Sequence, residues 1–283
     1  MTMRERGLAV MGQRDVANPK LQVREATKVY PTASGDLVAI DRCTLDVHAG
    51  EIVSIVGPSG CGKTTLLWSM SGLHGLTSGE VLLDGKKITG PSPEIGMVFQ
   101  DANLLPWRNL RSNILFPFEI KREKPDHDWI AKLTNRVGLE GFDARMPREL
   151  SGGMQQRAAL VRALSFKPSV LLMDEPFGAL DAFTREEMNH LVEEIYLDTK
   201  TTIVLITHSI EEAIFLSDRI IVMSPRPGRI AKEYKVPFER PRSFEIMATK
   251  EVFDLTNAIK ADIVGAQVSK SRSAVRPAVY AAH

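Results

Sequence analysis

Residues 57–64 of this chain read Gly57-Pro58-Ser59-Gly60-Cys61-Gly62-Lys63-Thr64 and fit the pattern G-x-x-x-x-G-K-[ST] at every fixed position. The apolar run over residues 52–56 predicts a buried strand, and the residues from Thr64 onward predict a helix. Glycines let such a loop turn so that consecutive backbone N–H groups surround a phosphate. Lys63 would neutralise the terminal phosphates, and the Thr64 hydroxyl would bind magnesium. The predicted nucleotide contacts are Gly57, Pro58, Ser59, Gly60, Cys61, Gly62, Lys63, Thr64 and Thr65. The alternative, a chance glycine-rich turn, requires that the strand or the helix be missing.

A second motif places two acids at the end of a strand. Residues 169–175 form a short apolar run that ends in Asp174 and Glu175, which is typical of a buried parallel strand. In an open α/β sheet, ligands bind at the carboxyl edge of the strands. Asp174 would therefore hold the magnesium through water, and Glu175 would polarise the water that attacks the γ-phosphate. The alternative for Glu175 is a solvated acid that caps the next helix.

A third motif, residues 150–157, begins a predicted helix with Ser151, Gly152 and Gly153. Exposed N–H groups, a hydroxyl and the positive end of the helix dipole would meet at one point there, which favours an anion. Read alone, the motif is equally an ordinary helix N-cap.

Together the three motifs resemble the ATP-binding cassette (ABC) family, and the resemblance covers roughly residues 21–239. It implies that the chain hydrolyses ATP with Mg²⁺, and that Lys63 and Glu175 are catalytic. It further implies that Gln100 is the lid glutamine, which senses magnesium and the attacking water, and that His208 contacts the γ-phosphate. Gly178 stands where the commonest family sequence has serine, four residues after Asp174.

The resemblance also implies contacts to the base and to a second copy of the chain. Tyr30 lies where the family places an aromatic that stacks on adenine, with Val38 as a neighbour; simple packing is the alternative for Tyr30. Since Lys63 and the acids complete one side of the nucleotide, the third motif is expected to cover the γ-phosphate bound to the opposite copy of a head-to-tail dimer. The residues expected to act in trans are Ser151, Gly152, Gly153, Gln155 and Asp181.

The expected fold class is α/β, a P-loop NTPase core with a mixed, mainly parallel sheet, an antiparallel β subdomain and an inserted helical subdomain. Strand-like alternation over residues 21–84 predicts the antiparallel layer, and the helical subdomain is expected at about 101–167. The expected boundaries are a flexible lead at 1–19, the ATPase domain at 20–240, a C-terminal helix at 241–268 and a flexible tail at 269–283. One face of that helix is expected to carry Phe244, Val252, Phe253, Leu255, Ile259 and Ile263.

The composition limits the classes of function that the chain could have. The 283 residues are 43% hydrophobic with a net charge of +1, so there is no electrostatic case for binding nucleic acid. The sequence has no apolar run near eighteen residues that would span a membrane. The two cysteines, Cys43 and Cys61, favour a reducing compartment. Cys61 beside bound phosphate would have a lowered thiol pKa and react with thiol reagents.

Two further stretches, Leu104-Leu105-Pro106-Trp107 and residues 224–230, look like the nitrate, sulfonate and taurine group of bacterial importers. The resemblance then implies an ATPase subunit at the cytoplasmic face of the inner membrane, peripheral to separate permease subunits and served by a solute-binding protein. An exporter subunit and a cassette ATPase acting on nucleic acid or protein assembly are the alternatives. The transported solute cannot be read from the chain.

Overall fold

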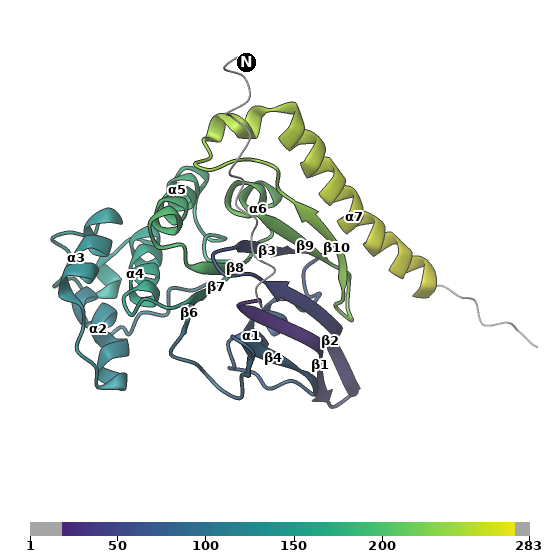
Figure 1. The fold of residues 1–283 in the computed structure, drawn as a ribbon, viewed down its shortest axis with the longest axis horizontal. Helices are drawn as coiled ribbons and strands as arrows, with labels where there is room; N and C mark the ends of the chain where they lie inside the picture. The colour runs from purple at the N-terminus through teal and green to yellow at the C-terminus, as the bar shows by residue number, and fades with distance from the viewer. Residues whose placement is uncertain (1–18, 275–283) are drawn as a thin grey trace, which may run out of the picture.

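The protein is described by a computed structural model that covers residues 19–274, in which two sheets lie against each other and helices surround them (Figure 1). The expected lead at 1–19 lies almost entirely outside the described residues, and so does the part of the expected tail from 275 onward.

The central sheet has six strands in the order β10-β9-β3-β8-β7-β6. Five of them run parallel, and only β10 pairs antiparallel with its neighbour. The strands β3, β7 and β8 are buried along their whole length, which is why their sequences are continuous apolar runs rather than alternating ones. The strands are β3 (Ile52–Val56), β6 (Ile95–Val98), β7 (Val170–Asp174), β8 (Thr202–Ile206), β9 (Arg219–Met223) and β10 (Ile230–Lys235).

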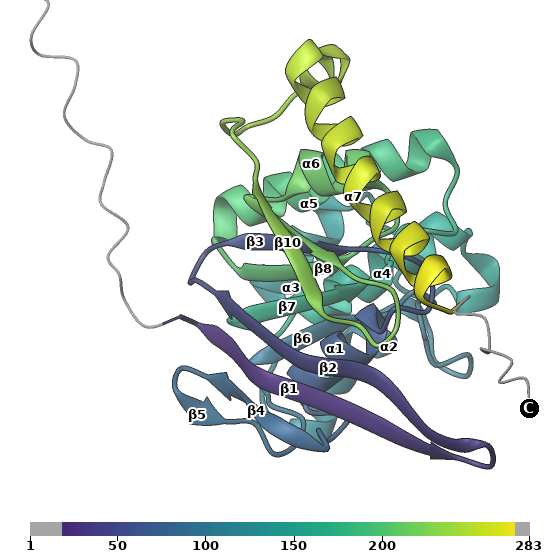
Figure 2. The same ribbon diagram turned by 90° about the vertical axis from the view of Figure 1, so that its right-hand side faces the viewer.

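The second sheet is antiparallel, with the order β2-β1-β4-β5. Figure 2 shows its two long strands, β1 and β2, running together as a ribbon beside the central sheet. Buried and exposed residues alternate over the second half of β2, as expected for a strand with one face on the core. The strands are β1 (Leu21–Thr32), β2 (Gly35–Val47), β4 (Ser78–Leu83) and β5 (Lys86–Lys87).

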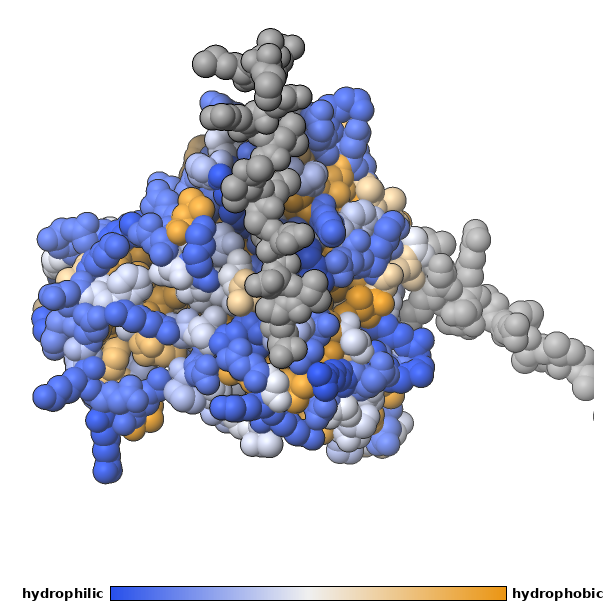
Figure 3. Space-filling model, in the orientation of Figure 1, coloured by the Kyte–Doolittle hydropathy of each residue, from blue (hydrophilic) through white to orange (hydrophobic). Residues whose placement is uncertain are grey.

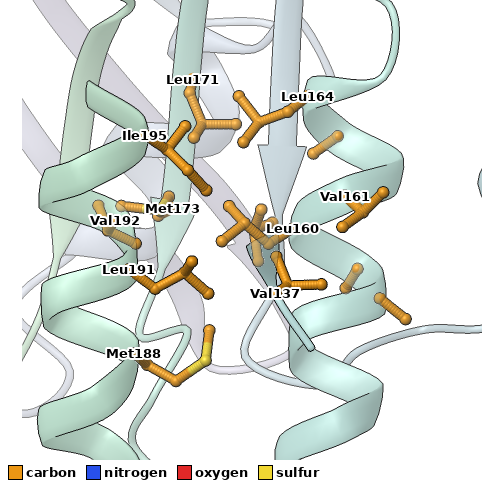
Figure 4. Packing of buried hydrophobic residues seen from close by; sticks show 14 of the residues in the cluster. Val137, Leu160, Val161, Leu164, Leu171, Met173, Met188, Leu191, Val192 and Ile195 are labelled. Atoms are coloured by element: carbon orange, nitrogen blue, oxygen red, sulfur yellow. The ribbon is translucent and has the colours of Figure 1, made fainter. Parts of the chain in front are cut away.

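Between β6 and β7 the chain forms a helical lobe, seen at the left in Figure 1. Its last helix, α4, joins the lobe to the core by placing Leu160 and Leu164 against β7 and the next helix along the chain (Figure 4). The lobe contains α2 (Leu110–Lys121), α3 (His127–Arg136), the 3-10 turn η1 (Pro147–Glu149) and α4 (Gly152–Leu164). The helices packed on the central sheet are α1 (Lys63–Met70), α5 (Ala182–Thr199) and α6 (Ile210–Leu216).

The C-terminal part comprises a 3-10 turn, η2 (Phe244–Ala248), and the long helix α7 (Lys250–Ala274), which extends along one side of the molecule (Figure 2). Val252 and Ile259 of α7 are buried against α6 and β9. Two of the residues expected on that apolar face lie elsewhere. Phe244 belongs to η2 and stacks on Phe215, because the helix begins only at Lys250, and Phe253 is 64% exposed on the outer side of α7.

The surface in Figure 3 is mostly hydrophilic, with apolar residues scattered over it. Within residues 19–274, the helices include none that is both long enough and apolar enough to cross a membrane.

Candidate nucleotide-binding and catalytic site

The site is assembled at one edge of the central sheet, where five parallel strands end side by side. The loop of residues 57–64 follows β3, and Glu175 follows β7. His208 comes after β8, and Gln100 comes after β6. Because the carboxyl ends of parallel strands meet at one edge, residues that are far apart in sequence converge here.

These residues line a cleft of about 600 Å³. The cleft brings together eleven of the residues predicted from the sequence: Tyr30, Gly57, Ser59, Gly60, Gly62, Lys63, Thr64, Thr65, Gln100, Glu175 and His208. Pro58 and Cys61 belong to the same loop but are buried beneath it.

The loop adopts backbone angles that favour glycine. Gly57, Gly60 and Gly62 all have positive φ, and Gly62 is the N-cap of α1 with φ 109°. A Cβ on Gly62 would lie 2.7 Å from the carbonyl oxygen of Ala39 on β2. The loop is therefore held closely against the antiparallel sheet, and the first residues of α1 line the cleft, where a helix N-terminus favours an anion. Lys63 Nζ donates to the carbonyls of Gly57 and Pro58, at 3.0 and 3.1 Å.

Asp174, at the end of β7, is 6% exposed and accepts two side-chain hydrogen bonds. Thr64 Oγ1 donates to Oδ1 at 3.0 Å, and Trp68 Nε1 donates to Oδ2 at 3.2 Å. Burial raises the pKa of the Asp174 carboxyl, and these two hydrogen bonds oppose that shift. The Thr64 hydroxyl and the Asp174 carboxylate thus place oxygen atoms side by side, as a cation site requires.

Glu175 and His208 face each other across the ends of β7 and β8. His208 Nδ1 lies 3.4 Å from Glu175 Oε2, and the Glu175 side chain is 24% exposed. Glu175 has a positive φ of 46°, while its N–H still donates to the carbonyl of Ile206 at 2.9 Å. A half-exposed carboxylate beside a histidine at the mouth of the cleft is suited to accept a proton from water.

The expected base contact lies at the other end of the cleft. The Tyr30 ring lines the cleft, and its hydroxyl is 3.0 Å from His74 Nδ1. Leu37 and Ala39 line the cleft beside Tyr30, whereas Val38 between them does not, because successive side chains of a strand point to opposite faces.

Gln100 connects the cleft to the helical lobe. Its backbone carbonyl accepts a hydrogen bond of 2.5 Å from Gln156 Nε2 on α4, and its exposed side chain lines the cleft. This hydrogen bond joins α4 directly to a residue that lines the cleft.

The residues expected to act in trans do not line the cleft of their own chain. Ser151 is the N-cap of α4 and accepts from the N–H of Met154 at 3.2 Å. Asp181 is the N-cap of α5 and accepts from Thr184 N at 3.1 Å, and the Thr184 hydrogen bonds lower the pKa of the Asp181 carboxyl. Gln155 donates to two carbonyls of the preceding turn. Ser151, Gly152 and Asp181 are exposed.

Comparisons with known proteins agree with this geometry. The sequence profile of the family described as "ABC transporter" matches residues 40–178. A taurine import ATP-binding protein (TauB) of Roseobacter denitrificans is 50% identical over 221 residues, which cover 77% of this chain and 82% of that protein. An aliphatic sulfonates import ATP-binding protein (SsuB) of Bacillus cereus is 41% identical over 227 residues, 80% of this chain and 90% of that protein.

The chain belongs to the family of ABC transporter ATP-binding subunits. Among solved structures, the dimeric bacterial ABC transporter cassette MJ0796 superposes with a TM-score of 0.69 at 32% identity, over 77% of this chain and 100% of that one. A second structure of the same cassette, in a post-hydrolysis state bound to ADP and Pi, gives the same values. The family, the fold class and the class of enzyme predicted from the sequence, a transport-coupled ATPase, are therefore confirmed.

One expectation about the cassette is wrong. The Cys61 thiol is 1% exposed, and burial raises its pKa above the ordinary value of 9.0, although the charge of Lys63 acts in the other direction. The side chain is buried under the loop and does not line the cleft. Burial also raises the pKa of Cys43, to about 11.

Arg226 is a cleft residue of this cassette that the motifs did not identify as a ligand. It lies in the turn after β9, lines the cleft, and donates from Nε to the carbonyl of Gly60 at 3.1 Å. Two residues on, Gly228 packs so tightly under the loop that a Cβ would lie 2.1 Å from the carbonyl oxygen of Cys61. Residues 224–230 had suggested only a subgroup of the family. The sequence pattern does not reveal that β9 pairs directly with β3, and this pairing brings the turn after β9 next to the P-loop.

Proposed function

We propose that this chain is the ATP-hydrolysing subunit of a multi-component importer that takes up a small solute through a separate membrane permease. The observation that carries the proposal is the convergence of the P-loop, Glu175 and His208 on one cleft, with Asp174 hydrogen-bonded to the Thr64 side chain that lines it. A phosphate-binding loop alone would fit many nucleotide-binding proteins. Asp174 and Glu175, at the end of β7 two strands away from β3, add the groups that hydrolysis requires.

In this proposal the cleft binds ATP between Tyr30 and the P-loop. The aromatic ring offers a flat face to the base, the loop N–H groups and Lys63 bind the phosphates, and Glu175 accepts a proton from the attacking water. His208, 3.4 Å from Glu175, fixes that carboxylate and contacts the terminal phosphate. Gln100 closes the site from the side of the helical lobe.

The site fits Mg²⁺ as well as ATP. Mg²⁺ binds proteins through one or two carboxylates together with substrate phosphates and water, rather than through an all-protein cage. Asp174 provides one such carboxylate, and Thr64 provides an adjacent hydroxyl oxygen. Residues 19–274 contain no group of three or more His, Cys, Asp or Glu that could hold a metal. The ion would neutralise charge on the β- and γ-phosphates.

We further propose that two copies bind ATP between them. Ser151, Gly152, Gly153, Gln155 and Asp181 of one copy would cover the phosphates held by the P-loop of the other, in a head-to-tail dimer. Closing of the pair on ATP and its reset by hydrolysis would then move the permease. The solved cassette that resembles this chain is described as dimeric, which supports the arrangement.

The permease would dock on the helical lobe, where Trp107 is 71% exposed. The importer class and its substrates are inferred from the names of the relatives, which import taurine and aliphatic sulfonates. We place this subunit at the cytoplasmic face of the inner membrane, with a sulfonate delivered by a solute-binding protein as the first substrate to test and nitrate as the second. Copurification from membranes with a permease supports this part of the proposal, and association only with nucleic acid or ribosomes contradicts it.

Glu175→Gln tests the ATPase site. The amide keeps the size of the side chain but cannot accept the proton, so kcat should fall by about 10²–10⁴-fold while the affinity for ATP stays within about twofold. Glu194→Gln, the same change at an exposed position of α5, serves as the control and should change neither quantity. Undiminished turnover in Glu175→Gln, or loss of ATP binding, would contradict the role of Glu175.

A further inference from the structure

Helix α1 holds both oxygens of the Asp174 carboxylate. Thr64 and Trp68 are four residues apart on α1, so their side chains lie on the same face, one turn apart. Thr64 Oγ1 donates to Oδ1 at 3.0 Å, and the Trp68 indole N–H donates to Oδ2 at 3.2 Å. The orientation of the carboxylate is therefore fixed by two donors from one rigid element.

The indole is itself held in place. The Trp68 ring is partly buried and meets the His74 ring edge to face, with centroids 4.8 Å apart and planes at 87°. His74 Nδ1 in turn lies 3.0 Å from the Tyr30 hydroxyl, and its backbone N–H donates to the carbonyl of Trp68 at 3.1 Å. Trp68 thus contacts Asp174 on one side and His74 on the other, and His74 in turn contacts Tyr30.

The hydrogen bond, rather than the bulk of the ring, is what Asp174 requires from position 68. Asp174 is 6% exposed, and a buried carboxylate is costly unless donors satisfy its oxygens. The indole N–H is a donor only, so it can bind this carboxylate and cannot compete for a cation. A phenylalanine would fill most of the same space without the donor.

We propose that Trp68 is a positioning residue for the magnesium ion: it holds Oδ2 of Asp174, so that the carboxylate and the Thr64 hydroxyl present their oxygens to Mg²⁺ together. This inference rests on the proposed ATPase function. Trp68 contacts neither nucleotide nor ion in this role and acts only through Asp174.

The test compares the affinity of the full-length protein for ATP in Mg²⁺ and in EDTA, for wild type and Trp68→Phe. The affinity of Trp68→Phe in EDTA should equal that of wild type, because the P-loop contacts are unchanged. The ratio of the affinity for ATP in Mg²⁺ to that in EDTA should be about tenfold smaller for Trp68→Phe than for wild type. This is the usual effect of removing a hydrogen bond to a charged group.

Trp129→Phe is the matched control. Its indole N–H also makes one hydrogen bond, to the carbonyl of Leu164 at 3.1 Å, but it belongs to the helical lobe. This variant should keep the wild-type gain from Mg²⁺. An unchanged Mg²⁺ gain in Trp68→Phe overturns the inference, and so does an equal loss of affinity in Mg²⁺ and EDTA, which would indicate packing alone.

A fluorescence measurement keeps the inference testable if Trp68→Phe does not fold. The chain has three tryptophans, so a Trp107→Phe/Trp129→Phe protein reports on Trp68 alone. Its emission should shift when Mg²⁺ is added to the ATP-bound protein and should not shift when Mg²⁺ is added together with excess EDTA. No shift overturns the inference. Failure of the wild type to bind ATP in either buffer contradicts the proposed function itself.

Discussion

Two loops of this cassette contain glycines at the start of a helix, and their surroundings differ. In the P-loop, a Cβ on Gly57 would lie 2.9 Å from the Met223 carbonyl oxygen, and one on Gly62 would lie 2.7 Å from that of Ala39. At the start of α4, a Cβ on Gly152 would meet nothing within 4 Å, and one on Gly153 only a methyl group of Thr184 at 3.0 Å.

The difference separates glycines that their own chain requires from glycines that it does not require. The P-loop glycines are required by contacts and backbone angles within their own chain. Gly152 has no such requirement, and the N-cap hydroxyl beside it is exposed. A glycine that its own chain leaves free is readily explained by close approach of another molecule. The contrast therefore supports a site completed by a second copy.

Among the variants that test this comparison, the largest effect should come from a bulky side chain at the start of α4. Ser151→Arg would occupy the surface that is expected to meet the nucleotide of the partner, so ATP-driven dimerisation should be lost and turnover should fall about 100-fold or more. ATP binding by the monomer should remain, because Ser151 does not line the cleft of its own chain. Size-exclusion chromatography with ATP, together with ATPase assays, measures both.

Glu194→Arg adds the same side chain at an exposed position of α5 and should leave dimerisation intact. If Ser151→Arg still dimerises and hydrolyses ATP normally, the start of α4 does not complete the nucleotide site of a second copy.

A pair of glycine substitutions tests the comparison directly. Gly62→Ala places a Cβ 2.7 Å from a backbone oxygen at φ 109°, which should cost about 1–3 kcal/mol of unfolding free energy and weaken ATP binding. Gly152→Ala should change the unfolding free energy by less than about 0.5 kcal/mol while reducing ATP-driven dimerisation. Denaturant unfolding and ATP titration of both variants check this. Equal destabilisation by the two substitutions would show that the protein's own packing constrains Gly152 as much as Gly62.

The reactivity of Cys61 reports how tightly the P-loop is packed. Because burial raises its pKa, the thiol stays protonated at neutral pH, and only the thiolate is alkylated. Iodoacetamide should therefore react about tenfold or more slowly than with free cysteine at pH 7.5, and the rate should keep rising as the pH passes 9.0, the ordinary value. ATP should slow the reaction further. A fast reaction that levels off below pH 8 would instead indicate an exposed, activated thiol.

The smallest effect is expected at the rim of the cleft. Arg226→Ala removes an exposed guanidinium that donates to the Gly60 carbonyl, so the affinity for ATP should fall about two- to fivefold with dimerisation retained. Arg229→Ala in the same turn removes a guanidinium that binds Asp41 instead, and it should leave the affinity unchanged. Equal effects of the two variants would mean that Arg226 acts only through the stability of the turn.

Much of the cleft could be predicted because its groups belong to short motifs that carry their own strand or helix. The P-loop follows β3 directly, and the acid pair ends β7, so sequence alone places them at one edge. Arg226 and Trp68 could not be found in that way. Arg226 reaches the cleft because β9 pairs with β3, and Trp68 meets Asp174 through the rotation of α1, neither of which a local pattern specifies.

The errors have a physical cause of the same kind. A lowered pKa of Cys61 is expected from its place beside bound phosphate near a helix N-terminus, but burial of the thiol has the larger effect and raises the pKa. Phe253 fits a helical repeat, yet α7 covers α6 and β9 with a face that excludes it. Packing against segments that are distant in sequence determines both the pKa of Cys61 and the exposure of Phe253. The spacing of residues along the sequence does not reveal that packing.

Gly228 has an evolutionary consequence. Its N–H donates to the carbonyl of Ala39, its own carbonyl accepts from Asp41, and it leaves no room for a side chain against Cys61. The nucleotide loop and a turn near the other end of the domain therefore fit each other sterically, so a change in one requires a matching change in the other. Recombination that exchanges the first half of this domain with a relative lacking the turn should yield chimeras that fold poorly, whereas exchange of both segments together should be tolerated.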